Sequence, residues 1–227
     1  MKNEKDIAIE FNEFSKNYTN DMIGCVPHYR DLVSSFGKFL PRDLNPEAIL
    51  DLGCGNGNIT AQLIPHFPEA VFNLVDASSE MLDLCRKQFN NYTVNFHNSY
   101  FKDFCFQKDH YDLVVAGFSL HHCNTKEKQS LFRKIYSSLK SGGVFCYSDL
   151  MINKTNPAHP ALLKEWGDFV NSNFPGGEKW DWVMEHYRIY DKPEDYHLQI
   201  EWLEQAGFNN IQIPYRDGYW IYLQAVK

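Results

Sequence analysis

The sequence lacks the features that define several protein classes. No apolar run approaches the length of a membrane span, and the charged start, MKNEKD, does not fit a signal peptide. Lysine and arginine form no cluster or tail and the net charge is −7, so no extensive nucleic-acid surface is expected. The six cysteines show no C-x-x-C spacing. We therefore expect reduced thiols in a cytoplasmic protein with no membrane contact and no metal site.

The run ILDLGCGNG at residues 49–57 combines a short apolar segment, an acid and three alternate glycines. A strand that leads into such a turn and then into a helix makes a nucleotide-type binding edge. Glycine lets a ligand approach the main chain, and the helix N-terminus offers free N–H groups. A second apolar run, residues 71–75, ends in Asp76, where an acid is well placed to bind ribose hydroxyls. The sequence therefore predicts a site for an adenosine cofactor.

The spacing of the glycines favours one cofactor. It reads G-x-G-x-G, whereas a dinucleotide fingerprint reads G-x-G-x-x-G. Asp51, just before the first glycine, would repel a pyrophosphate but suits an ammonium group. S-adenosylmethionine (SAM) has that ammonium and a ribose, and it has no phosphate. The string DLGCGNG closely resembles the first motif of class I SAM-dependent methyltransferases. YDLV (111–114), LKSGG (139–143) and WLEQAGF (202–208) resemble later motifs of that family.

Periodicity and capping residues predict the order of elements. Apolar spacing indicates helices at 6–18 and 26–40, Ser78 and Asn124 are expected to cap two more, and Pro193 is expected to open a helix through Ala206. Strands are expected near 49–52, 71–76, 92–97, 111–117, 144–148, 208–214 and 219–226. This order matches a Rossmann-like α/β fold, a seven-stranded mostly parallel sheet with a closing antiparallel hairpin, plus a helical cap.

Four segments are expected. These are an N-terminal helical lid (1–44), a SAM-binding core (45–150), an inserted aromatic cap (151–192), and a final helix and hairpin (193–227). The resemblance and the element order together give the expected cofactor-binding residues, which are Tyr18, Tyr29, Asp51, Gly53, Cys54, Gly55, Asn56, Gly57, Asp76, Ala77, Met81, Asn98, Ser99, Tyr100 and Phe118. The family often has an acid after the third strand that binds adenine, and this chain has Asn98 and Ser99 there instead.

Two further groups of residues face the expected acceptor. His121 and His122 follow the fourth strand, where an imidazole can act as a base or orient a substrate, although both can equally serve to pack the loop. In the cap, Trp166, Tyr187 and Arg188 are candidates for substrate contact, and Arg188 is the only arginine of that segment. We expect it to anchor an acidic group.

Three functions are compatible with these features. The first is a SAM-dependent methyltransferase that acts on a small-molecule acceptor and releases S-adenosylhomocysteine (SAH). The second follows from the segment DMIGCVPHY (21–29), which resembles the N-terminal part of carboxy-SAM synthase, the enzyme that makes the carboxymethyl donor for wobble uridine in tRNA. That resemblance implies that Arg188 binds the extra carboxylate. The third is a non-catalytic SAM- or SAH-binding domain. A homodimer is left open.

Overall fold

The computed structural model describes residues 7–14 and 18–227, and its centre is one seven-stranded sheet in the order β3-β2-β1-β4-β5-β7-β6. The strands are β1 Ala48–Leu52, β2 Val71–Asp76, β3 Val94–Asn98, β4 Tyr111–Gly117, β5 Leu139–Leu150, β6 Asn209–Asp217 and β7 Trp220–Val226. Strands β1 to β5 pair in parallel, and β7 runs antiparallel to both β5 and β6. The predicted Rossmann-like sheet with a closing hairpin is confirmed.

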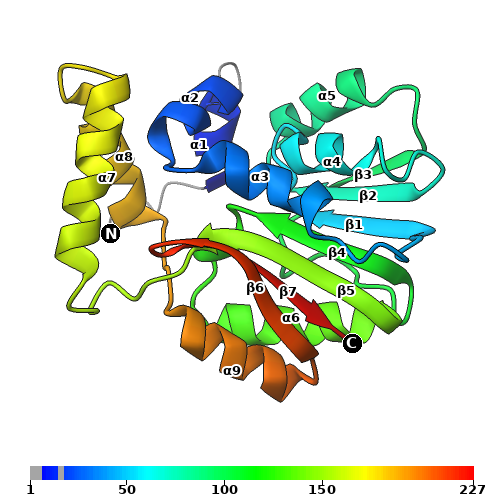
Figure 1. Cartoon of the computed structure of the whole chain (residues 1–227). Coiled ribbons are helices and arrows are strands. Elements are labelled where there is room, and N and C mark those ends of the chain that lie inside the picture. Colours follow the sequence, from blue (N-terminus) through cyan, green and yellow to red (C-terminus); the bar gives the residue numbers. More distant parts are fainter. Residues whose placement is uncertain (1–6, 15–17) are drawn as a thin grey trace.

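Helices cover both faces of this sheet (Figure 1). Helices α3 (Tyr29–Lys38), α4 (Asn58–Leu63) and α5 (Ser79–Gln88) lie on one face, and α6 (Thr125–Ser138) and α9 (Tyr196–Ala206) lie on the other. Successive strand residues point to opposite faces, so Ile49 and Leu113 pack in one core while Leu50 and Val114 pack in the other. Burial on both faces explains why these strands read as continuous apolar runs.

Four further helices lie at one end of the sheet (Figure 1). They are α1 (Ile7–Phe14), α2 (Tyr18–Cys25), α7 (His159–Asn173) and α8 (Glu178–Ile189). The indole of Trp166 in α7 donates a hydrogen bond to the Cys25 carbonyl oxygen (2.5 Å), and Lys179 pairs with Asp21 (3.0 Å). The N-terminal helices and the inserted segment therefore form one cap. Among the described residues, no helix has the length and apolar character needed to cross a membrane.

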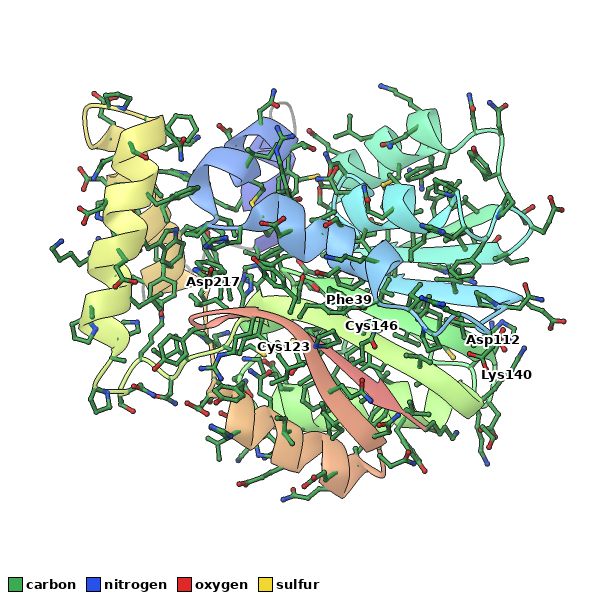
Figure 2. The ribbon with its side chains drawn as sticks, in the orientation of Figure 1. Phe39, Asp112, Cys123, Lys140, Cys146 and Asp217 are labelled. Atoms are coloured by element: carbon green, nitrogen blue, oxygen red, sulfur yellow. The ribbon has the colours of Figure 1, made fainter. Side chains whose placement is uncertain are left out.

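The opposite end of the sheet is held by charged contacts. Asp112 and Lys140 lie side by side there (Figure 2), with nitrogen and oxygen 2.9 Å apart. The Asp112 carboxylate also accepts hydrogen bonds from the backbone N–H groups of Glu47 and Ala48, both at 3.0 Å. These bonds tie β1 to β4 at the end where the two strands begin.

Local signals set most element boundaries. Ser78 caps α5, and Asn124 forms a capping box with Glu127 at the start of α6, as predicted. Helix α9 begins at Tyr196 rather than at the predicted Pro193, because the Asp195 carboxylate accepts the His197 N–H and caps the helix there.

Two other boundaries differ from prediction. Strand β5 starts at Leu139 rather than at residue 144, since Leu139 pairs with Tyr111 before a register shift. The N-terminal part contains α1, α2 and α3 in place of the two predicted helices. Residues 1–6 and 15–17 of those predicted segments lie outside the described residues.

Candidate active site between the glycine turn and the helical cap

A cavity of about 370 Å³ lies where β1, β2, β3 and β4 end. This is the edge at which open α/β sheets bind ligands, beside the point where the strand order reverses between β1 and β4. Its lining comes from loops that follow the strands and from the cap. The residues are Ile7, Ala8, Phe11, Tyr18, Gly53, Gly55, Asp76, Ala77, Ser78, Met81, Ser99, Tyr100, Phe101, Lys102, Phe118, Ser119, His122, Cys123, Glu127, Ser130, Leu131 and Lys134.

Asp76 is held at the rim of this cavity by the glycine turn. One carboxylate oxygen accepts the Gly55 N–H and the other accepts the Ser78 N–H, both at 2.8 Å. Burial raises the pKa of Asp76 above its ordinary value. Gly55 has φ +52°, and a β-carbon built on it would meet only the Tyr18 ring, at 3.7 Å or more. The turn therefore leaves room for a ligand against the main chain, next to a fixed carboxylate.

Asp51 lies fully buried beneath the same turn and does not line the cavity. One oxygen accepts a hydrogen bond from the Thr60 hydroxyl (2.7 Å), and the other has no hydrogen-bond partner. Burial raises the pKa of Asp51 to about 7. A cation bound near this carboxylate would favour its charged form.

The structure divides the predicted cofactor residues into two groups. Those that line the cavity are Tyr18, Gly53, Gly55, Asp76, Ala77, Met81, Ser99, Tyr100 and Phe118. Those that do not are Tyr29, Asp51, Cys54, Asn56, Gly57 and Asn98. Several of the second group support the walls instead. The Asn98 amide donates to the carbonyl oxygens of Asp76 and Ala77, and the Asn56 amide donates to the Thr19 hydroxyl.

A second cavity, about 80 Å³, adjoins the first and shares Phe11, Tyr18 and Phe118 with it. Its other lining residues come from the cap, from the end of β5 and the start of β7, from the turn after β4 and from the segment between α8 and α9. They are Glu10, Met22, Cys25, Val26, His121, Asp149, Leu150, Trp166, Trp182, Val183, His186, Tyr187, Asp191, Pro193 and Trp220. Phe118 has φ +52°, a left-handed conformation that is unfavourable for an aromatic residue. Such strain is typical of functional sites, and here it places the ring between the two cavities.

Histidines and acids gather in the wall between the two cavities. Leu120–His122 form a short 3₁₀ turn after β4. His121 Nδ1 lies 2.5 Å from one carboxylate oxygen of Asp149, and the backbone N–H of His121 donates to the other oxygen at 2.9 Å. One oxygen of Asp191, Oδ1, lies 3.3 Å from His122 Nδ1 and 3.6 Å from the Nε2 atoms of both His121 and His186.

Burial and mutual contact set the charge of this cluster. Burial lowers the pKa of His122, and it lowers the pKa of His186 to about 4. Burial would also lower the pKa of His121, but Asp149 and Asp191 raise it overall. Burial would raise the pKa of Asp191, but the three neighbouring histidines hold it well below its ordinary range. Asp191 is therefore ionised while His122 and His186 are neutral.

The predicted acceptor residues have different surroundings. Trp166 and Tyr187 are buried and line the second cavity, and the Tyr187 hydroxyl lies 2.7 Å from His159 Nε2. Arg188 is exposed, lines neither cavity and donates its Nε–H to the Met184 carbonyl oxygen (3.0 Å). The helical turn of α8 points successive residues in different directions, so Arg188 does not follow Tyr187 into the site.

Sequence reasoning missed several residues of the site. Helix α1 contributes Ile7, Ala8 and Phe11 to the first cavity. The apolar spacing of that segment predicted a helix but not its position at the cavity. Asp149, His186 and Asp191 join His121 and His122 from distant segments. No local pattern signals such a grouping, because only the folded chain brings these segments together.

Comparison with known proteins agrees with this geometry. Residues 49–143 match the family model for a methyltransferase domain. The chain is 30% identical over 216 residues to the carboxy-S-adenosyl-L-methionine synthase of Campylobacter fetus subsp. fetus. The aligned region spans 91% of this chain and 89% of that protein.

Solved structures share the fold at lower identity. A SAM-dependent methyltransferase from Mesorhizobium loti has a TM-score of 0.62 and 18% identity, covering 85% of this chain and 96% of that one. Human N-acetylserotonin methyltransferase, solved in complex with SAM, has a TM-score of 0.61 and 17% identity, covering 97% of this chain and 56% of that one. The motifs, the sheet and the 30% identical relative together show that the chain belongs to the class I SAM-dependent methyltransferases, whose cofactor is SAM.

Proposed function

We propose that the protein transfers a methyl group from SAM to a small-molecule acceptor held in the second cavity, and releases SAH. The observation that carries this proposal is the shared wall. Phe11, Tyr18 and Phe118 line both cavities, so a ligand in the first cavity lies next to a ligand in the second. Methyl transfer requires this proximity, because the acceptor atom must approach the methyl carbon in line with the bond that breaks.

The residues of the first cavity fit SAM. The carboxylate of Asp76 would accept hydrogen bonds from the ribose hydroxyls, and the Gly53–Gly57 turn above Asp51 would hold the amino-acid end. Met81, Tyr100 and Phe101 provide an apolar wall for the adenine. SAM supplies an activated methyl group on a sulfonium. The chain's part is to orient both ligands and to exclude water, which the helices of the cap favour by covering the strand ends.

His121 and His122 remain the proposed catalytic pair. His122 lines the SAM cavity and His121 lines the second cavity, so the 3₁₀ turn that carries them stands between the two. An imidazole at that position would contact an acceptor directly. Asp149 fixes the orientation of His121 through two hydrogen bonds.

A carboxy-SAM synthase-like activity is the second candidate, favoured by the 30% identical relative from Campylobacter fetus. Such an enzyme must hold an additional carboxylate near the sulfonium. The described residues that line the second cavity include Glu10, Asp149 and Asp191 but no lysine or arginine, and Arg188 points elsewhere. These lining residues offer no lysine or arginine to pair with such a carboxylate, so methyl transfer to an acceptor is the function that we favour.

Two measurements test the proposal: the identity of the bound nucleoside and the destination of the methyl group of SAM. Mass spectrometry of the ligand that copurifies should find SAM or SAH, whereas a carboxylated adduct would favour the second candidate. Incubation with methyl-deuterated SAM and a small-molecule extract should move the label into an extract component and yield SAH. Binding of SAM with no SAH formed in any extract would instead support a non-catalytic SAM-binding domain.

Two further expectations belong to this proposal. The N-terminal helices and the inserted cap would act together as the lid and acceptor pocket over the 45–150 core. The cysteines at 25, 54, 85, 105, 123 and 146 are all free, which supports a reducing compartment such as the cytoplasm.

A further inference from the structure

The wall between the cavities contains buried polar atoms that make no hydrogen bond. They are both ring nitrogens of His122, Nδ1 of His186 and Oδ1 of Asp191. Buried polar groups in folded proteins are nearly always hydrogen-bonded, and each exception requires an explanation. Other unsatisfied atoms, such as Asp51 Oδ1, lie elsewhere, but these four are grouped as imidazole nitrogens around one carboxylate oxygen. A bound cation would satisfy Asp191 Oδ1 and one ring nitrogen of His122.

The distances from Asp191 Oδ1 to the neighbouring histidine nitrogens match those within a coordination shell. Asp191 Oδ1 lies 3.3 to 3.6 Å from one ring nitrogen each of His121, His122 and His186. Nitrogen and oxygen ligands about 2.0–2.2 Å from a tetrahedral zinc ion are separated from one another by about 3.3–3.6 Å. The ligand atoms of His121, His122 and Asp191 also lie within 4.8 Å of one another. An ion could be held with small movements of the side chains.

Surrounding contacts fix these side chains in place. Asp149 bonds to Nδ1 of His121, which directs Nε2 of that ring toward Asp191. A carboxylate in this role is the usual outer partner of a metal-binding histidine. The segment that contains Asp191 is bonded to the 3₁₀ turn, because the backbone N–H of Lys192 donates to the His121 carbonyl oxygen (2.6 Å). The Lys154 ammonium holds the same segment by donating to the Asp191 carbonyl oxygen (2.7 Å).

We propose that His121, His122 and Asp191 bind one divalent transition-metal ion of the Zn²⁺ type and leave its fourth coordination position open. Imidazole nitrogens suit zinc, iron, copper and nickel, whereas Mg²⁺ and Ca²⁺ prefer shells of oxygen atoms. Three acids among the described residues line the second cavity. Glu10 lies 3.9 Å from Nδ1 of His186, and Asp149 is already satisfied by His121 and by backbone N–H groups, so Asp191 Oδ1 is the oxygen that remains for the ion.

The position of the site would allow the ion to contact a bound acceptor. His122 lines the SAM cavity, and His121, His186 and Asp191 line the second cavity. The open coordination position would therefore face the second cavity and receive an oxygen or nitrogen atom of the acceptor, so that in the ion-bound protein His121 and His122 would act through the ion and not as free imidazoles. This last step rests on the proposed function, but binding of the ion does not.

Calorimetry with ZnCl₂ tests the site on the untagged full-length chain after treatment with a chelator and dialysis. We expect one equivalent of Zn²⁺ to bind with a dissociation constant in the micromolar range or below, and MgCl₂ to give no such binding. Titration with Co²⁺ should produce the intense visible bands of a tetrahedral nitrogen and oxygen site. Asp191→Asn and His122→Ala should each weaken Zn²⁺ binding at least about tenfold. His197→Ala, which changes an exposed histidine of α9, should leave it unchanged.

Two results would overturn the site. One is a stripped wild-type chain that binds no stoichiometric Zn²⁺ and shows no tetrahedral Co²⁺ bands, a measurement that does not depend on whether the variants fold. The other is wild-type Zn²⁺ affinity in variants whose circular dichroism shows that they are folded. Titration of the same samples with SAM keeps the two proposals separate. In the wild-type chain, Zn²⁺ binding without SAM binding counts against the proposed function, and SAM binding without Zn²⁺ binding counts against the metal site.

Discussion

At the scale of single residues, the charge of Asp51 links ligand binding to pH. Burial raises its pKa to about 7, so between about pH 4 and 7 the folded protein keeps a proton that the unfolded chain has lost. The contribution of Asp51 to stability is present below that window and is lost as pH rises through it. The full difference corresponds to about 4 kcal/mol, given the folded pKa of about 7.

The first prediction compares wild type with Asp51→Asn. The neutral amide does not titrate, so the free energy of unfolding of wild type should fall relative to that of the variant between pH 5 and pH 8. Urea unfolding at several pH values measures this difference. Because an ammonium group bound above the turn would favour the charged form of the buried carboxylate, saturating SAM should reduce the fall in wild type. Parallel pH profiles for the two proteins would contradict the assignment.

A second prediction concerns two glycines of the same turn. A β-carbon on Gly57 (φ +86°) would lie 2.4 Å from the Phe89 ring, whereas one on Gly55 (φ +52°) would meet only Tyr18, at 3.7 Å. Gly57→Ala should therefore cost about 1–3 kcal/mol of stability through overpacking, in addition to backbone strain. Gly55→Ala should lose less stability but more than tenfold in SAM affinity. Urea unfolding and calorimetry measure the two effects, and the reverse order would mean that Gly55 does not face the ligand.

At the scale of elements, the sequence predicts the bounds of helices and strands best where those bounds depend on residues close by in the chain. Strands β2 and β4 have the predicted bounds because each is an apolar run between polar ends. Ser78 and Asn124 cap their helices because a short side chain reaches the free N–H groups nearby. Helix α2 was missed since Tyr18–Cys25 has no strong apolar stripe. Its position depends on distant contacts with α7.

The third prediction concerns that contact. Trp166→Phe removes the donor to the Cys25 carbonyl oxygen and leaves it buried without a partner, which should cost about 1–3 kcal/mol. Because α2 also carries Tyr18 at the SAM cavity, the affinity for SAM should fall as well. Trp180→Phe, at the ring that packs against Trp166, is the matched control and should change SAM affinity less. Equal effects of the two substitutions would show that ring size, not the hydrogen bond, holds α2.

At the scale of the whole molecule, the sequence predicts the sheet edge but not the full site. Asp76 and Gly55 could be assigned because the βαβ order fixes which loops meet at that edge. Asp191 could not, because its loop reaches His121 and His122 only through the packing of the cap on the core. Arg188 was predicted at the acceptor because it is the only arginine of the inserted cap and because of the resemblance to carboxy-SAM synthase, but the direction of a side chain on α8 depends on where that helix docks.

The last prediction tests whether the cap closes over the ligand. Helices α1 and α2 contribute Ile7, Phe11 and Tyr18 to the first cavity, so SAM should slow amide hydrogen exchange in both helices as well as in the Gly53–Gly57 turn. Helix α8 lines only the second cavity, so SAM alone should protect it less. Helix α9, on the far side of the sheet, should not change. Protection confined to the turn and Asp76 would mean that the N-terminal helices do not form the lid, because a ligand that contacts them must slow their opening.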